Sequence, residues 1–466
     1  MSDPHFEADP PARFSDDSRL GSDQGDPTQQ IPRAGERGLE AGASGRRTDS
    51  TVGHPDGERT SDIWLPDDAL ADQLPAARNA GLPGPGLPEA IGWTFGCFVL
   101  QIIAGLGVFA LLAMYAVVQS LGLESISPET IESALSDIMS PAGKLKLQED
   151  NLSLFVAGTM LICIPVTIFA VRLRLGKEAP RLLSLARPSL PHVVLLAALF
   201  LPMTIVSNEI YRRSMLAWDA LLKLQPELTR FEIPNTNDIV PMLVAQTPLT
   251  WVVLALGLGP ALWEELLFRG IIGRGLTARW GMIAGVLLTS LFFAVVHMHP
   301  AHAAGVLSLG IVMHVIYLAT RSIWAPMLYH FMNNTYGVLA TKWAYDAGQD
   351  IHIESEGPGI LLLLTASLSA VVSLALLWSM RTRFQLPGGV EWSPGHATAE
   401  RPPAHLNCES RYRRPHALHV SLAVLCCAAF AAAFWFTPDA APDARNTTQH
   451  TVSADSEQGS SSTFVH

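Results

Sequence analysis

The chain has 466 residues, of which 49 % are hydrophobic and 16 % are charged, and its formal net charge is −11. Charged residues make up about a quarter of a typical soluble protein, so this composition excludes an ordinary soluble protein of the same length. The negative charge does not indicate a basic partner, because residues 1–88 hold 16 acidic residues against 8 arginines and therefore account for −8 of the −11.

The N-terminal segment 1–88 is rich in Pro, Gly and Ser and has no apolar periodicity. Such a composition buries too little apolar surface to fold, so we predict a disordered acidic tail. The tail is too hydrophilic to contain a signal peptide, and we expect the first membrane span to act as an uncleaved signal.

Eight apolar runs follow between residues 89 and 380. Most approach the roughly 20 residues that a helix needs to cross about 30 Å of hydrocarbon. They are 92–118, 152–171, 192–206, 248–268, 281–298, 303–319, 323–340 and 358–380. A basic, Pro-rich linker is predicted at 381–416, an extra span at 417–436 and a disordered tail at 437–466. The expected fold class is all-α, a polytopic membrane bundle of about eight or nine transmembrane helices.

Positive residues in short loops indicate the cytoplasmic side of a membrane protein. If the helices alternate in direction, four basic loops fall on one side, at 172–187, 274–279, 321 and 381–414. This predicts a cytoplasmic N-terminus. Segment 207–230 carries positive charges on the opposite side, and its mixture of apolar and charged residues predicts a helix lying in the interface.

Several function classes lack support in the sequence. The five cysteines, Cys97, Cys163, Cys408, Cys426 and Cys427, form no CxxC pair and are interpreted as small buried residues. No phosphate-binding glycine loop or zinc-finger spacing occurs. The basic residues are explained by topology, so we expect no nucleic-acid partner.

Ionisable residues inside spans are costly, by about 3 kcal/mol each, and indicate function. In the fourth span, Glu265 and Arg269 are four residues apart and can form an ion pair on one helix face. Glu264 is then left without a local partner and becomes a candidate general base or acid. An isolated EExxxR sequence would fit equally well a helix end at the interface.

A second polar position lies at Phe293-xxx-His297, near the end of the fifth span, where the two residues share one helix face. A single histidine at a helix end is more often structural than catalytic. His299 and His302 follow and could complete a metal cluster, but the spacing is not HExxH and Pro300 interrupts the helix.

The third polar position is His330-xxx-Asn334 in the seventh span. Imidazole and carboxamide groups can stabilise an oxyanion in a site of low dielectric constant, although such residues also serve as polar contacts between membrane helices. His314 in the sixth span has no patterned partner and is interpreted as structural. Together the three positions provide a base, a second proton-handling group and neutral donors, which suffice for attack of water on an amide.

These three motifs, in this order, resemble those of the CPBP family of CAAX proteases and bacteriocin-processing enzymes. The family is marked by EExxxR, FxxxH and HxxxN on separate membrane helices, and the similarity covers about residues 190–340. The segment from Arg321 to Pro326 also resembles the usual lead-in to the third motif. The resemblance implies that Glu264 activates water together with His297, that His330 and Asn334 form the oxyanion site, and that Glu265 and Arg269 hold the geometry beside Phe293.

The resemblance further implies an intramembrane endopeptidase acting on a membrane-embedded or lipidated protein or peptide. The family was formerly classed as metalloproteases and is now viewed as glutamate-dependent, so we expect no metal cofactor, with zinc as the alternative. In the predicted topology the motif ends at the cytoplasmic side. The Arg- and Ala-rich, Lys-poor composition indicates a multi-pass protein of a bacterial plasma membrane.

Two other functions remain open from the sequence. A non-proteolytic scaffold or bacteriocin-immunity factor would tolerate loss of the Glu264 charge. A transporter would distribute polar residues through paired half-helices, whereas here they concentrate in three helices.

Overall fold

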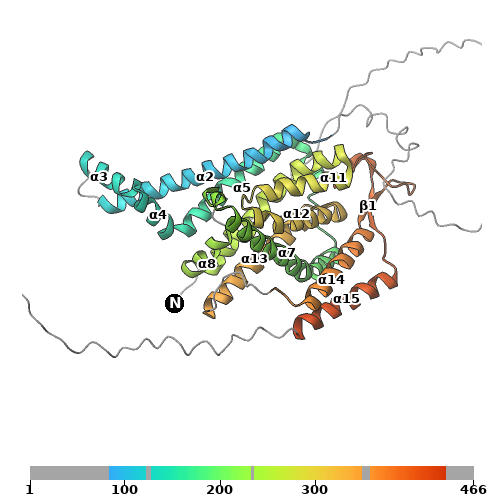
Figure 1. Cartoon of the computed structure of the whole chain (residues 1–466). Coiled ribbons are helices and arrows are strands. Elements are labelled where there is room, and N and C mark those ends of the chain that lie inside the picture. Colours follow the sequence, from blue (N-terminus) through green and yellow to red (C-terminus); the bar gives the residue numbers. More distant parts are fainter. Residues whose placement is uncertain (1–82, 122–126, 232–235, 349–356, 437–466) are drawn as a thin grey trace, which may run out of the picture. The chain divides into compact units, whose positions relative to one another are not determined.

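The computed structural model describes residues 83–121, 127–231, 236–348 and 357–436. The predicted tails therefore lie outside the described residues, except for 83–88. The described chain is almost entirely helical (Figure 1), which confirms the predicted all-α fold class.

The elements follow one another along the chain as α2 (Leu87–Leu121), α3 (Pro128–Met139), α4 (Pro141–Asp150), α5 (Leu152–Leu175), η1 (Gly176–Glu178), α6 (Ala179–Leu182), α7 (Leu190–Leu224), η2 (Pro226–Phe231), α8 (Thr236–Gln246), α9 (Leu249–Val252), η3 (Val253–Leu258), α10 (Gly259–Leu267), η4 (Phe268–Gly273), α11 (Arg274–Val295), α12 (Pro300–Thr320), α13 (Trp324–Asp346), α14 (Ile360–Ser379), β1 (Thr382–Gln385), η5 (Ala404–Leu406), β2 (Glu409–Tyr412) and α15 (Ala417–Phe436). Strands β1 and β2 pair antiparallel, with Thr382 opposite Tyr412.

Seven helical stretches in the described residues are long and apolar enough to cross a membrane: 87–121, 152–182, 190–224, 249–295, 300–320, 360–379 and 417–436. This count is near the predicted eight or nine, and the nine predicted segments differ from it at two places. The predicted spans 248–268 and 281–298 form one stretch, and α13, which replaces 323–340, contains His330, two asparagines and Lys342 and is less apolar than the others. The chain is a multi-pass membrane protein.

The stretch 249–295 is a helical hairpin that turns at Gly281. This glycine has a φ of 73°, a left-handed conformation that glycine adopts at little cost. A Cβ atom at Gly285 would clash with the Thr277 backbone, and the Phe268 and Phe293 rings are 5.2 Å apart. In each pair, the two residues are about equally far from Gly281 in the sequence, one on each limb. The two limbs therefore pack against each other.

Segment 207–230, predicted as a helix lying in the interface, consists of the last turns of α7 and of η2. Residues 207–224 continue α7 without a break. Glu209 is buried and accepts hydrogen bonds from Arg212 at 2.7 Å and from Arg213 at 2.5 Å. Glu209 thus pairs with both arginines and offsets part of their positive charge within the helix.

The four basic loops lie at one end of the bundle, together with β1 and β2, and we call this the hairpin end (Figure 1). Glu400 joins two of them, with an oxygen 3.2 Å from Arg274 Nη2 and another 4.0 Å from Arg181 Nη1. The guanidinium carbon of Arg321 lies over the Phe384 ring, 5.2 Å from the ring centre. Segment 381–416 therefore contains a folded part that covers this end.

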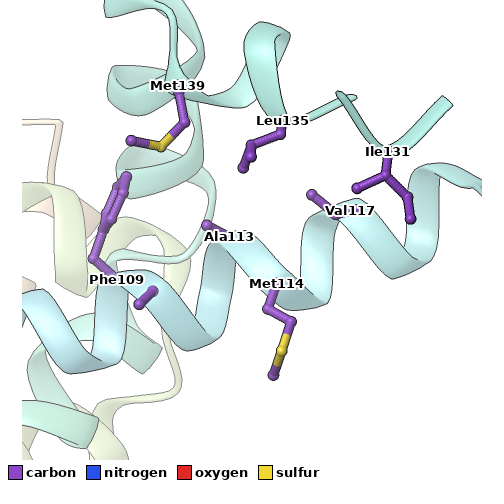
Figure 2. A pocket seen from close by; sticks show the side chains of 8 residues that line it. Phe109, Ala113, Met114, Val117, Ile131, Leu135 and Met139 are labelled. Atoms are coloured by element: carbon purple, nitrogen blue, oxygen red, sulfur yellow. The ribbon is translucent and has the colours of Figure 1, made fainter. Parts of the chain in front are cut away.

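Helices α3, α4 and α8 lie at the opposite end, which we call the distal end (Figure 1). There the apolar residues Ile131, Leu135 and Met139 lie on one face of α3, at positions i, i+4 and i+8, and pack along the last turns of α2. Between the two helices is an open apolar pocket of about 370 Å³ (Figure 2), which is lined by Phe109, Ala110, Ala113, Met114, Val117, Ile131, Leu135 and Met139.

Candidate active site

The first motif lies on α10, a short α-helix between two π-helical turns, η3 and η4. A π-turn widens the helix and shifts the face of the residues that follow, and such turns are frequent at functional sites. Glu264 and Glu265 lie between the two turns, and Arg269 lies within the second one. The two turns therefore affect the directions in which these three side chains point. All six residues of η4 are buried.

Glu265 is the centre of the polar cluster. Its Oε1 accepts a hydrogen bond from Arg269 Nη1 at 2.8 Å and lies 2.9 Å from His330 Nδ1. The side chains of Glu265 and Arg269 are fully buried. Arg269 also donates through Nη2 to the Gly310 carbonyl oxygen at 3.1 Å. The predicted pair is thus present, and it additionally holds His330.

The contact with Glu265 determines which imidazole nitrogen of His330 is left for chemistry. The oxygen that faces Nδ1 already accepts from a guanidinium, so Nδ1 is the donor and Nε2 carries the lone pair of the neutral ring. Nε2 lies 4.0 Å from Glu264 Oε2. His330 therefore presents a hydrogen-bond acceptor to Glu264.

Glu264 differs from its neighbour in having no ion-pair partner within direct hydrogen-bond reach. Its Oε2 is buried and makes no hydrogen bond among the described residues, while the side chain as a whole keeps 12 % of its surface exposed. A carboxylate that is largely buried yet unpaired has the environment expected of a reacting group.

Phe293 connects the second motif with the other two. The guanidinium of Arg269 lies 4.5 Å from the Phe293 ring centre, which is a cation–π geometry. The ring centres of His297 and His330 lie 5.2 Å and 5.9 Å from the same ring. His297 Nδ1 is 3.0 Å from the Phe293 carbonyl oxygen and donates to it, so Nε2 is left as an acceptor.

The third motif reaches the first through the backbone of η3. Asn334 donates from Nδ2 to the Leu256 carbonyl oxygen at 3.0 Å. The close approach of the two helices depends on Gly257, where a Cβ atom would lie 2.8 Å from Thr335 Oγ1. Asn334 keeps a second N–H that this contact does not use.

The remaining histidines do not assemble into a metal site. His299 faces the ring of Trp218, and His302 lies between His297 and Tyr211. His314 is buried behind Gly273, where its ring leaves no room for a side chain. In the described part of the chain, no group of three or more His, Cys, Asp or Glu side chains could hold a metal ion.

The structure thus brings six of the seven predicted residues into one connected cluster: Glu264, Glu265, Arg269, Phe293, His297 and His330. Asn334 lies one helical turn from His330 and bonds to η3 instead. Among the described residues no hydrogen bond joins His297 to Glu264. The sequence did not predict that the carbonyl groups of Leu256 and Gly310 accept hydrogen bonds from the site. The only sign of them in the sequence is a glycine, which is Gly310 itself in one case and Gly257, next to Leu256, in the other.

Two comparisons with known proteins agree with the motifs. Residues 246–336 match the family model described as type II CAAX prenyl endopeptidase Rce1-like. This range contains all three motifs, and the match confirms the resemblance predicted from them.

A curated protein of Bacillus subtilis (strain 168), "Putative membrane peptidase YdiL", is 32 % identical over 108 residues, which cover 23 % of this chain and 43 % of that protein. The chain therefore matches less than half of the length of this relative. No solved structure matches the chain. The comparisons support a membrane peptidase in general.

Proposed function

We propose that the chain is an intramembrane endopeptidase in which Glu264 and His330 activate a water molecule that hydrolyses a peptide bond of a membrane-embedded or lipidated substrate. The observation that carries the proposal is the 4.0 Å between Glu264 Oε2 and His330 Nε2. Both atoms act as hydrogen-bond acceptors when Glu264 is ionised and His330 is neutral, and the contact with Glu265 holds the imidazole in place.

That distance fits a single water molecule. A water that donates both hydrogens in bonds of about 2.8 Å spans acceptors separated by roughly 4 Å. Its oxygen lone pairs then point away from the two acceptors, toward the carbonyl carbon of a bound peptide. Glu265 keeps the imidazole in the required tautomer, which is the role of a carboxylate in other histidine dyads.

The steps balance as an ordinary hydrolysis. Glu264 takes a proton from water as the oxygen attacks the carbonyl carbon, and the tetrahedral oxyanion receives the second N–H of Asn334. The proton then passes from Glu264 to the leaving amine as the C–N bond breaks. His297, whose Nε2 is left as an acceptor, assists the proton transfers. The proposal departs here from the resemblance, which implies that His297 activates water with Glu264 and that His330 belongs to the oxyanion site.

Peptide cleavage by the purified protein in detergent tests this proposal. The substrates are a peptide library in which some members carry a prenyl or acyl group, and the variants are Glu264→Gln and His330→Ala. Glu409→Gln, a change on the exposed strand β2, is the matched control. We expect cleavage by the wild type and the control, no cleavage by the two site variants, and no effect of a strong chelator.

Other outcomes lead to other functions. Loss of activity with a chelator and recovery with zinc would refute the metal-free mechanism. A Glu264→Gln variant that cleaves as well as the wild type would refute the assignment of the base. If no peptide is cut and Glu264→Gln still complements a deletion strain, the non-proteolytic scaffold or immunity function is supported instead.

A further inference from the structure

Burial around the candidate active site changes abruptly along the helices. On the side of the hairpin end, every residue from Leu267 to Gly273 is buried, and so is every residue from Ile316 to Ile323. In α13, five of the six residues from Ala325 to His330 are buried. The segments of η4 and α12 present no accessible face, and this stretch of α13 presents only Leu328, so this side of the site is closed.

On the side of the distal end, the same helices become accessible. All seven residues from Phe331 to Gly337 are at least partly exposed. Seven consecutive residues cover two full turns of a helix, so contact of one stripe with lipid cannot explain their exposure. Nearby, Met298 beside His297 and Leu254 in η3 are 52 % and 41 % exposed.

The folded part of segment 381–416 closes the hairpin end. Thr382 donates to the Thr320 carbonyl oxygen at 3.0 Å. Arg181 donates to the Arg401 carbonyl oxygen at 2.9 Å, in addition to the contacts of Glu400. A peptide could approach Glu264 from this end only after these contacts had broken.

The charge distribution assigns the two ends to the two sides of the membrane. The hairpin end carries the basic loops, whereas the accessible residues beside the site at the other end, Phe331 to Gly337, include no charged residue. Basic loops stay in the cytoplasm, so the accessible side of the site faces outward. The first motif itself runs from Glu264 toward the hairpin end, so the outward direction concerns only the side on which the site is open.

We infer that the substrate reaches the site from the extracytoplasmic side, and that it is a membrane-anchored protein or peptide whose scissile bond lies near the outer end of its apolar anchor. This inference rests on the proposed peptidase function. Residues such as Leu254, Met298 and Tyr336 would contact the apolar part of such a substrate.

Cysteine labelling tests the direction without requiring activity. In a chain whose other native cysteines are replaced, Met298→Cys and Tyr345→Cys report on the distal end and native Cys408 on the hairpin end. We expect a membrane-impermeant maleimide to label the first two in intact cells and Cys408 only in inside-out vesicles. The opposite pattern, labelling of both ends from one side, or an unreactive Met298→Cys would overturn the inference.

A second experiment separates the direction of access from the peptidase function. A sequence that the purified protein cleaves is fused to either the outer or the inner end of a single-span anchor, and both fusions are reconstituted with the protein. We expect cleavage of the outer fusion alone. Cleavage of the inner fusion, alone or together with the outer one, would refute the direction and leave the peptidase intact. Outward labelling of a protein that cleaves no member of the peptide library would refute the peptidase and leave the direction intact.

Discussion

The two adjacent glutamates should respond oppositely to the same substitution. Glu265→Gln removes the charge that neutralises Arg269, whose side chain is fully buried. Breaking a buried pair by removing one partner costs about 3–5 kcal/mol, because the other charge is left uncompensated. Glu264→Gln removes a charge that has no partner within direct hydrogen-bond reach, so we expect a much smaller loss in the free energy of unfolding than for Glu265→Gln.

The assay is unfolding of the purified protein in detergent, followed in parallel with peptide cleavage. Glu265→Gln should lower the unfolding midpoint strongly, and Glu264→Gln should abolish cleavage while the midpoint stays near that of the wild type. The double variant Glu265→Gln with Arg269→Gln should recover part of the lost stability, because it removes both charges of the pair. Equal destabilisation by the two single variants would refute the division of the pair into one structural and one reacting carboxylate.

Three further predictions concern the surroundings of the site. Asn334→Ala should lower the cleavage rate by about 10²–10³ at a cost near 1 kcal/mol of stability, with Asn333→Ala, measured in the same assay, as the control that remains active. Gly257→Ala should destabilise the protein in thermal unfolding by about 1–3 kcal/mol, because the added methyl would lie 2.8 Å from Thr335 Oγ1. Burial lowers the pKa of His396 below its ordinary value of 6.5, so the undocked imidazole takes up a proton more readily. Docking of segment 381–412 is therefore expected to be stable above about pH 6.5 and to weaken below it; limited proteolysis would show this, and His396→Gln should remove the dependence.

The sequence predicted those parts of the site that depend on spacing within one helix. Glu265 and Arg269 are one turn apart, so their pairing follows from helix geometry alone. The Phe293 and His297 rings are in contact for the same reason. The membrane bundle was also predictable, because the length and apolarity of a span are local properties.

Features that depend on distant backbone were not predictable. The π-turns on both sides of α10 alter the helix register without a composition that marks them. Asn334 contacts a carbonyl group 78 residues away, and Glu400 pairs with Arg274 across 126 residues. A Pro-rich segment with mixed charges is interpreted as a linker until those distant partners are known.

The hairpin centred on Gly281 has a consequence for how the protein enters the membrane. Both of its limbs carry site residues and follow each other directly in synthesis, so they can be inserted together. A charged residue at the centre of a span raises the cost of insertion by about 2.5–3.5 kcal/mol, but Glu265 and Arg269 can neutralise each other within one nascent helix. Glu264 has no such local partner. The nearest imidazole, that of His330, is on α13 and is synthesised later. Glu264 therefore stays without a compensating group during insertion until α13 has packed against α10.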